Sequence, residues 1–257
     1  MTLQLSFLPV MATLFMLMFA RLGSMLMLMP ALGETSIPMR VRLVMALMLT
    51  LVLYPVGSLT YPQNVTENLP RLLLLMFGEM AFGLVIGLSA KMITFVLQTA
   101  GVIIASQSSL AMALGTDVTN AGQQGTLVSN YLSIMGVTLI FVTDTHYLII
   151  AAMHDSFTLF PPGGWLPMGD FAKMATESVA NVFSIAVRMS APFLVVGIVF
   201  NFGLGLLNKL MPQMQIFFIA MPASIAIGLG LLMVLMSTMM TFYMGHLQDA
   251  LGQFVAG

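Results

Sequence analysis

The sequence predicts an all-α membrane protein with six to seven long, kinked hydrophobic helices arranged as helical hairpins. Of its 257 residues, 59% are hydrophobic and only 7% are charged, whereas soluble domains carry about 25% charged residues. The apolar residues also gather in runs of roughly 18 or more, the length that crosses a bilayer as a helix. Water alone is therefore not the solvent of this chain.

The apolar runs predict the helices in chain order. We expect them at about residues 10–32, 41–60, 70–91 continuing through 92–114, 126–153, 178–207 and 213–245. The first break, PALGETSIPMR, contains two Pro, a Gly and a Glu, and the second, YPQNVTENLPR, contains two more Pro. Such residues favour turns and end helices.

Two further breaks divide the second half of the chain. Residues 115–125, GTDVTNAGQQG, form a polar gap punctuated by Gly. Residues 160–170, FPPGGWLPMGD, form the largest break and hold the only Trp, where an anchor at the membrane interface is expected. The last two helices are joined by a short polar stretch that contains Pro212.

Composition and motifs argue against several function classes. The net charge is −1 without a basic block, so nucleic acid is not an expected partner. The absence of Cys excludes disulfides and Cys-ligated metals. His146 and His154 are not in an HExxH arrangement, and neither a GxSxG motif nor a Gly-rich phosphate loop occurs. We therefore expect neither an enzyme nor a cofactor or metal site.

Several ionisable residues lie inside the apolar runs: Arg21, Glu79, Lys91, Asp144 and Arg188. Each costs about 2.5–3.5 kcal/mol at the centre of a membrane helix. Glu79 and Lys91 are roughly 18 Å apart along one helix and cannot pair with each other. These charges either form a proton or ion path or are structural groups held against other helices or near span ends. We expect the structural role.

Small residues predict close helix packing. Gly83 and Gly87 form a GxxxG motif, which lets two helix backbones approach each other. The same residue spacing recurs at Gly101 with Ala105 and at Ser224 with Gly228. The sequence therefore predicts a chain packed on many neighbouring helices.

Two other stretches combine polar and apolar residues unusually. Residues 205–225, GLLNKLMPQMQIFFIAMPASI, are too polar for a simple span and return to apolar residues too soon for a simple loop. Residues 107–123 alternate apolar with small residues at Leu110, Met112 and Leu114. From spacing alone, this second stretch indicates a helix end followed by a surface loop.

Four sets of residues resemble the FliR family of flagellar export-gate subunits and its relatives in virulence type III secretion. The first three sets are Ala20, Arg21 and Gly23; Ile37, Pro38, Arg40 and Arg42; and Gly78, Glu79, Gly83 and Gly87. The most specific set is Asn208, Lys209, Pro212, Gln213, Phe217, Phe218 and Pro222. The resemblance extends over nearly the whole chain.

The resemblance implies a single export-gate domain over residues 1–257. Its N-terminal part, about 1–177, would be FliP-like and include a plug loop at 107–123, and its C-terminal part, 178–257, would be a FliQ-like helical hairpin. Leu110, Met112 and Leu114 would form the plug that closes the pore. The polar stretch around Pro212 would be the FliQ-like bend, in contact with partner proteins.

The resemblance also implies partners and a location. FliR-like proteins join FliP and FliQ in a helical assembly, with FlhB around its base and FlhA nearby, in the bacterial inner membrane at the flagellar basal body. Unfolded export substrates and membrane lipid are the other expected partners. The sequence MPASI lacks the Lys frequent in virulence members, which favours the flagellar form. A secondary transporter is a more distant alternative, but it predicts two matching halves with broken helices, and no such repeat is visible.

Overall fold

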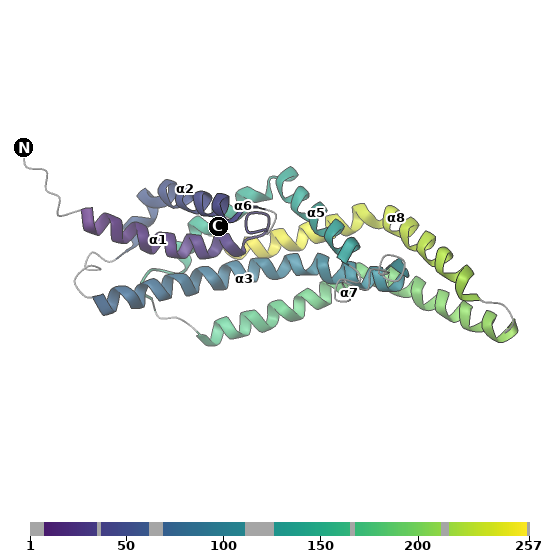
Figure 1. Cartoon of the computed structure of the whole chain (residues 1–257). Coiled ribbons are helices and arrows are strands. Elements are labelled where there is room, and N and C mark those ends of the chain that lie inside the picture. Colours follow the sequence, from purple (N-terminus) through teal and green to yellow (C-terminus); the bar gives the residue numbers. More distant parts are fainter. Residues whose placement is uncertain are drawn as a thin grey trace, which may run out of the picture. The chain divides into compact units, whose positions relative to one another are not determined.

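The computed structural model describes residues 8–34, 37–61, 69–110, 126–164, 168–211 and 216–255. These residues form helices and no strands (Figure 1). The helices are α1 (Leu8–Leu28), α2 (Met39–Gly57), the short 3-10 helix η2 (Ser58–Thr60), α3 (Leu69–Gln107), α5 (Thr126–Val142), α6 (Thr145–Leu159), α7 (Met168–Leu210) and α8 (Ile216–Gly252). The predicted all-α class is confirmed.

The lengths of these helices confirm a membrane protein. Among the described residues, α1, α2, α3, α7 and α8 are each long and apolar enough to cross a bilayer. The pair α5 and α6 passes the same test together but is bent at the break between them. The predicted number of six to seven helices agrees with the seven α-helices described.

Local residue chemistry sets the end of α1 and the start of α2. Pro30 follows α1 and cannot continue its hydrogen-bond ladder, and Ala31 then adopts a left-handed conformation with φ of 65°. The Gly33 N–H donates to the Met29 carbonyl at 2.8 Å, which closes the turn. Pro38 precedes α2, and its carbonyl accepts the Val41 N–H at 2.9 Å. The turn after Pro30 and the helix start after Pro38 agree with the predicted break, although α2 already includes Met39 and Arg40.

Several boundaries differ from the sequence prediction. Helix α1 ends at Leu28 rather than near residue 32, and α3 ends at Gln107 rather than near residue 114. The predicted helix 126–153 is interrupted at Asp144, which has a left-handed φ of 57° between α5 and α6. Helix α7 begins at Met168 rather than near residue 178, because its polar first turns are helical as well. Helix α8 continues to Gly252 rather than ending near residue 245.

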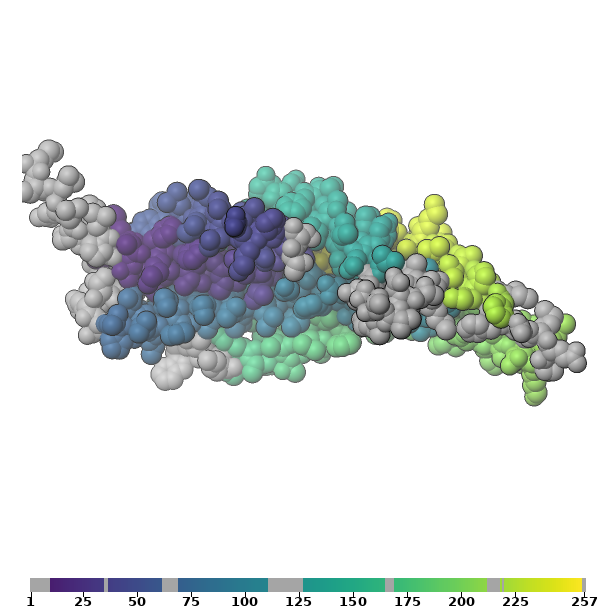
Figure 2. All heavy atoms as spheres, in the orientation of Figure 1, coloured from purple at the N-terminus to yellow at the C-terminus, as the bar shows by residue number. Residues whose placement is uncertain are grey.

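The chain divides into two compact units, each made of discontinuous segments. Unit 1 contains Met1–Met92, Ile140–Ser178 and Leu247–Gly257, and unit 2 contains Ile93–Leu139 and Val179–His246. In unit 1, α1 packs against α2 and supplies fully buried side chains such as Leu17, Leu22 and Leu26. In the view of Figure 2, α2 lies on the surface of this unit. The second half of α1 therefore contributes much of the core of unit 1.

Unit 2 is held together by close approaches at Gly residues. A Cβ built on Gly101 of α3 would lie 2.5 Å from the Ser129 Cα of α5. A Cβ on Gly228 of α8 would clash with Ser108, which immediately follows α3. Real Cβ atoms do not tolerate such distances, so Gly is required where these helices cross.

Candidate functional site: a buried ion pair in unit 1

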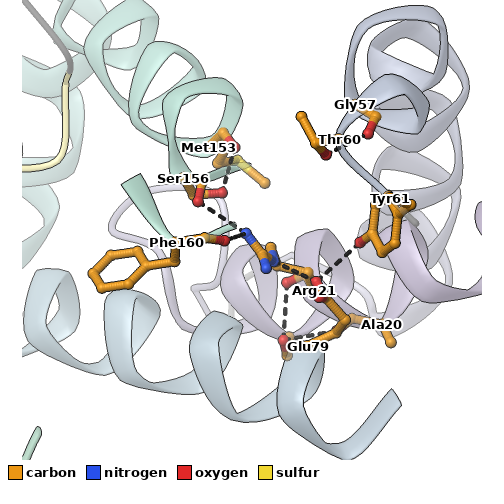
Figure 3. A network of polar contacts seen from close by, with 10 residues as sticks. Ala20, Arg21, Gly57, Thr60, Tyr61, Glu79, Met153, Ser156 and Phe160 are labelled. Atoms are coloured by element: carbon orange, nitrogen blue, oxygen red, sulfur yellow. Dashed lines mark hydrogen bonds and ion pairs between the residues drawn. The ribbon is translucent and has the colours of Figure 1, made fainter. Parts of the chain in front are cut away.

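A polar cluster lies inside the apolar core of unit 1, and we call it the Arg21 cluster (Figure 3). It consists of the side chains of Arg21, Tyr61 and Glu79 and the backbone carbonyls of Ser156 and Phe160. Arg21 Nε donates to Glu79 Oε2 at 2.5 Å, and the Tyr61 hydroxyl donates to the same oxygen at 2.9 Å. The cluster therefore joins α1, α3, the end of α6 and the residue that follows η2.

The ion pair between Arg21 and Glu79 is almost completely withdrawn from solvent. The exposed fractions of the two side chains are 0% and 1%. Removing two charges from water costs several kcal/mol per ion, and their attraction offsets this only with good geometry and further hydrogen bonds. The guanidinium and the carboxylate each make such additional bonds, so either charge alone in this place would be strongly destabilising.

The end of α6 supplies further acceptors for Arg21. Arg21 Nη1 donates to the Ser156 carbonyl at 2.8 Å and to the Phe160 carbonyl at 2.9 Å. The last carbonyls of a helix lack intrahelical partners and carry the negative end of the helix dipole. Figure 3 shows Arg21 between this helix end and Glu79. Arg21 therefore caps α6 while it pairs with α3.

Aromatic rings surround the guanidinium. The Arg21 Cζ atom lies 5.3 Å from the centroid of the Phe82 ring and 4.8 Å from that of Phe157. Phe82 also packs against Phe160, with ring centroids 5.4 Å apart. Cation–π contacts of this kind add to the stabilisation of a desolvated cation.

Close packing of α3 on α1 brings the two charges together. A Cβ on Gly83, one turn after Glu79, would collide with the Ser24 Oγ and with the backbone carbonyl of Arg21. A Cβ on Gly87 would lie 2.9 Å from the Leu28 Cβ. The GxxxG motif predicted to pack helices thus lies directly against α1. Without this short distance, a Glu side chain on α3 could not reach Arg21.

Tyr61 completes the coordination of the carboxylate. It follows η2 directly and is only 6% exposed. Burial, and next the negative charge of Glu79, raise the pKa of Tyr61 far above its ordinary value. The phenol therefore keeps the proton that it donates to Glu79. Sequence reasoning missed Tyr61, because it stands at the start of a polar, Pro-rich break and carries no local signal of burial.

The hydrogen bonds of the Arg21 cluster tie four segments of unit 1 together. Arg21 Nε and the Tyr61 hydroxyl both donate to the same Glu79 oxygen. Arg21 also donates through Nη1 to the carbonyls of Ser156 and Phe160. Within the described residues, no group of three or more His, Cys, Asp or Glu is placed to bind a metal. The structural role expected for Arg21 and Glu79 stays a prediction.

The other predicted intramembrane charges lie elsewhere. Lys91 is half-buried on α3, twelve residues beyond Glu79. Asp144 is exposed at the left-handed break before α6. Arg188 is exposed near the middle of α7. The structure thus brings together two of the five predicted charges, Arg21 and Glu79.

The residues predicted to form the bend lie around the ends of α7 and α8. Asn208 and Lys209 are exposed in the last turn of α7, and Phe218 is 74% exposed in the first turn of α8. Pro222 lies inside α8. Pro212, Gln213 and the side chain of Phe217 lie outside the part of the chain that the structure describes.

The predicted plug is described only at its first residues. Leu110 is 6% exposed and lines an apolar groove of unit 2 together with Val128 and Leu232. Just before it, Ser109 has a left-handed φ of 54°, and its hydroxyl donates to the Ser224 hydroxyl at 3.1 Å. The remaining plug residues, Met112 and Leu114, fall outside the described residues.

Comparison with known proteins gives matches over most of the chain. The family described as "Bacterial export proteins, family 1" matches residues 12–250. The chain is 40% identical over 215 residues to "Flagellar biosynthetic protein FliR" of Caulobacter vibrioides, covering 82% of this chain and 83% of that protein. The same-named protein of Bacillus subtilis is 27% identical over 216 residues, or 83% of this chain and 82% of its own length. "Yop proteins translocation protein T" of Yersinia pestis is 26% identical over 184 residues, or 69% of each chain.

Proposed function

Because the chain belongs to the FliR family of bacterial export proteins, we propose that it is the FliR-type subunit of a flagellar type III export gate. Family membership and its apolar helices make it a membrane subunit of a type III export apparatus. The flagellar assignment is carried by one observation, the higher identity to a flagellar relative than to the Yersinia translocation protein. The virulence apparatus is the alternative that this second relative supports.

In this proposal the chain assembles with FliP and FliQ into the channel through which unfolded flagellar proteins leave the cell. FlhB and FlhA are the further partners, and the site of assembly is the inner membrane at the flagellar basal body. The length of α7 supports a setting of this kind. Its 43 residues extend about 65 Å, more than twice the roughly 30 Å hydrocarbon core of a bilayer. Part of its apolar surface therefore needs to be covered by protein.

The exposed side chains of α7 support the same conclusion. Val195, Ile198 and Phe202 are 61%, 67% and 69% exposed. Large exposed apolar surfaces mark contacts with other proteins or with lipid. An assembly that surrounds α7 with partner helices would remove these side chains from water along the whole helix.

The division of the chain into two parts belongs to the proposal. Residues 1–177 are proposed as FliP-like and 178–257 as FliQ-like, with α7 from residue 178 onward and α8 as the FliQ-like hairpin. The end of α7 and the start of α8 expose Asn208, Lys209 and Phe218. An exposed cation and an exposed aromatic side chain at one end of the hairpin suit a contact with a partner, and we assign this contact to FlhB.

The closed state of the channel is proposed to depend on a plug at Leu110, Met112 and Leu114. Leu110 is already packed among apolar residues of unit 2. Apolar constrictions close pores to water and ions without a specific partner, because they dewet. Met adapts its shape easily and suits a surface that must repack when an unfolded chain passes.

Deletion of the gene and complementation with the full chain test the proposed function. We expect the deletion strain to lose swimming and the secretion of flagellar filament protein, and the intact gene to restore both. A tagged chain should also co-purify with the FliP and FliQ homologues of the same bacterium. If the deletion strain swims normally but no longer secretes an injectisome protein, the chain is a subunit of the virulence apparatus instead.

A further inference from the structure

The exposed face of α7 contains a cation in an unusual place. Arg188 lies twenty residues after the start of α7 and 22 residues before its end, and it is exposed. The side chains that α7 buries in unit 2 include Val182, Ala186 and Phe193. Arg188 follows Ala186 by two positions, or about 200° around the helix. Its side chain therefore points away from the packing of unit 2.

The described part of unit 2 cannot neutralise this cation. Its described segments, 93–110, 126–139, 179–211 and 216–246, contain no Asp or Glu. Charged side chains in apolar helices are usually paired, because an unpaired one costs about 2.5–3.5 kcal/mol on insertion scales. The described part of its own unit thus offers Arg188 no carboxylate.

Arg188 belongs to a regular stripe along the exposed face of α7. Positions three and four residues apart lie on one side of a helix, and the stripe reads Asn181, Ser184, Arg188, Ala191, Val195, Ile198 and Phe202. All of these residues are exposed except Ala191, which is half-buried. The first three are polar, and the last four are apolar. Spacing of this kind is typical of a seam that receives a second helix.

No placement in lipid alone suits this face. Val179, Phe183 and Val187, which precede Arg188, are apolar and 43%, 59% and 45% exposed. If Arg188 lies at the water interface, these three apolar side chains project into water. If these side chains lie in the hydrocarbon, then Arg188 lies there with Asn181 and Ser184. A protein helix that covers the stripe and brings one acidic side chain resolves both mismatches.

We propose that the stripe Asn181–Phe202 on α7 is the docking seam for an apolar helix of a partner subunit that carries a carboxylate opposite Arg188. Charge complementarity selects this occupant, since the seam offers one cation and two polar side chains at one end and apolar side chains at the other. The guanidinium pairs with the carboxylate, while Ser184 and Asn181 lie one and two turns away as further hydrogen-bond groups. This inference rests on the proposed role as one subunit of a multi-subunit gate.

Charge reversal in the full chain tests the seam. The variants Arg188→Glu and Arg188→Lys replace the chromosomal gene, and incorporation of the tagged chain into the detergent-extracted export complex is measured on native gels. We expect Arg188→Glu to lower incorporation by about tenfold or more, because like charges facing each other cost several kcal/mol. Arg188→Lys keeps the charge and should retain most of the incorporation. The matched control is Arg71→Glu, at an exposed position two residues after the start of α3, which should assemble as wild type.

Crosslinking identifies the occupant and completes the test. A photoreactive benzoylphenylalanine replaces Ser184, one turn from Arg188, and the crosslinked peptide is mapped by mass spectrometry. We expect crosslinks to an apolar partner helix within about one turn of an Asp or Glu, and replacement of that acid by Lys should restore incorporation of Arg188→Glu. Wild-type assembly of Arg188→Glu, crosslinks to lipid alone, or failure of the exchanged charges to restore assembly would each overturn the seam. Failure of the wild-type gene to restore swimming would instead remove the proposed function itself.

Discussion

Arg21 of α1 and Glu79 of α3 form an ion pair with a 2.5 Å contact at a place where neither side chain is more than 1% exposed. They are 58 residues apart in the chain. The pair is supported by Tyr61 and by two carbonyls at the end of α6. The cation is therefore held inside an apolar core, and its hydrogen-bond partners all belong to unit 1.

A double-mutant cycle on this pair gives the first prediction. Arg21→Met and Glu79→Met should each destabilise unit 1 by about 3–5 kcal/mol, because each leaves an uncompensated buried charge. The double variant removes both charges, so we expect it to be less destabilised than the sum of the two single variants. Thermal unfolding of the purified, detergent-extracted assembly measures this coupling.

A conservative change at the same pair, Glu79→Gln, extends the first prediction and distinguishes a role in assembly from a role in transport. Glu79→Gln should lower the amount of assembled complex while leaving transport per assembled complex near wild type. The measurement is filament-protein secretion divided by the amount of complex on native gels. Normal assembly with secretion abolished would show that Glu79 acts in a proton path instead.

The contact of α3 with α1 gives the second prediction. Gly83→Ala places a Cβ against the Arg21 carbonyl, and overpacking of this kind costs about 1–3 kcal/mol. We expect a lower unfolding temperature and a lower yield of complex. Gly230→Ala in α8 is the matched control, since nothing lies within 4 Å of its added Cβ. Ala favours helices over Gly by about 1 kcal/mol, so the control should be as stable as wild type or more so.

The break between α5 and α6 gives the third prediction. Asp144 has a φ of 57°, a conformation that Gly and Asn adopt readily and β-branched residues do not. Asp144→Gly and Asp144→Asn should therefore be tolerated, whereas Asp144→Val should destabilise the break by about 1–2 kcal/mol. Unfolding temperature and secretion are measured for all three variants. Loss of secretion in the stable Asn variant would indicate that the carboxylate itself is needed.

The plug gives the fourth prediction. Met112→Ser together with Leu114→Ser should leave the complex assembled but permeable to ions, because a polar constriction no longer dewets. Conductance, or small-molecule uptake by cells that contain the complex, measures the leak. Leu110 is the plug residue that is packed inside unit 2, so Leu110→Ala should in addition destabilise this unit by about 2–5 kcal/mol. A leak equal to wild type in the assembled double Ser variant would place the plug elsewhere.

The fold was largely predictable from the sequence. Apolar runs that are long enough to cross a bilayer and that end at Pro and Gly are compatible with few structures other than membrane helices. The missed break at Asp144 has neither residue, and a single Asp in a left-handed conformation leaves no clear pattern in the sequence. The early start of α7 was missed because Asp170, Lys173 and Glu177 interrupt the apolar pattern on which the prediction depended.

The site was predictable in part. Arg21 and Glu79 were identified as misplaced charges, and Glu79 was expected to find its partner outside its own helix. The identity of that partner depends on which helices pack together, and residue spacing within one helix does not reveal this. Tyr61 was not identified, because a Tyr at the edge of a polar break is usually an interfacial residue.

The spacing of the Arg21 cluster along the chain also sets an order of events during synthesis. Ribosomes add about 5–20 residues per second, so Glu79 is added about 3–12 s after Arg21. Ser156, which supplies a carbonyl to Arg21 and is 135 residues away, is added about 7–27 s after Arg21. During that interval the first helix carries an unneutralised guanidinium and is poorly suited to remain in the bilayer. The nascent chain therefore depends on another protein or membrane component to hold α1 until α3 and α6 have been made.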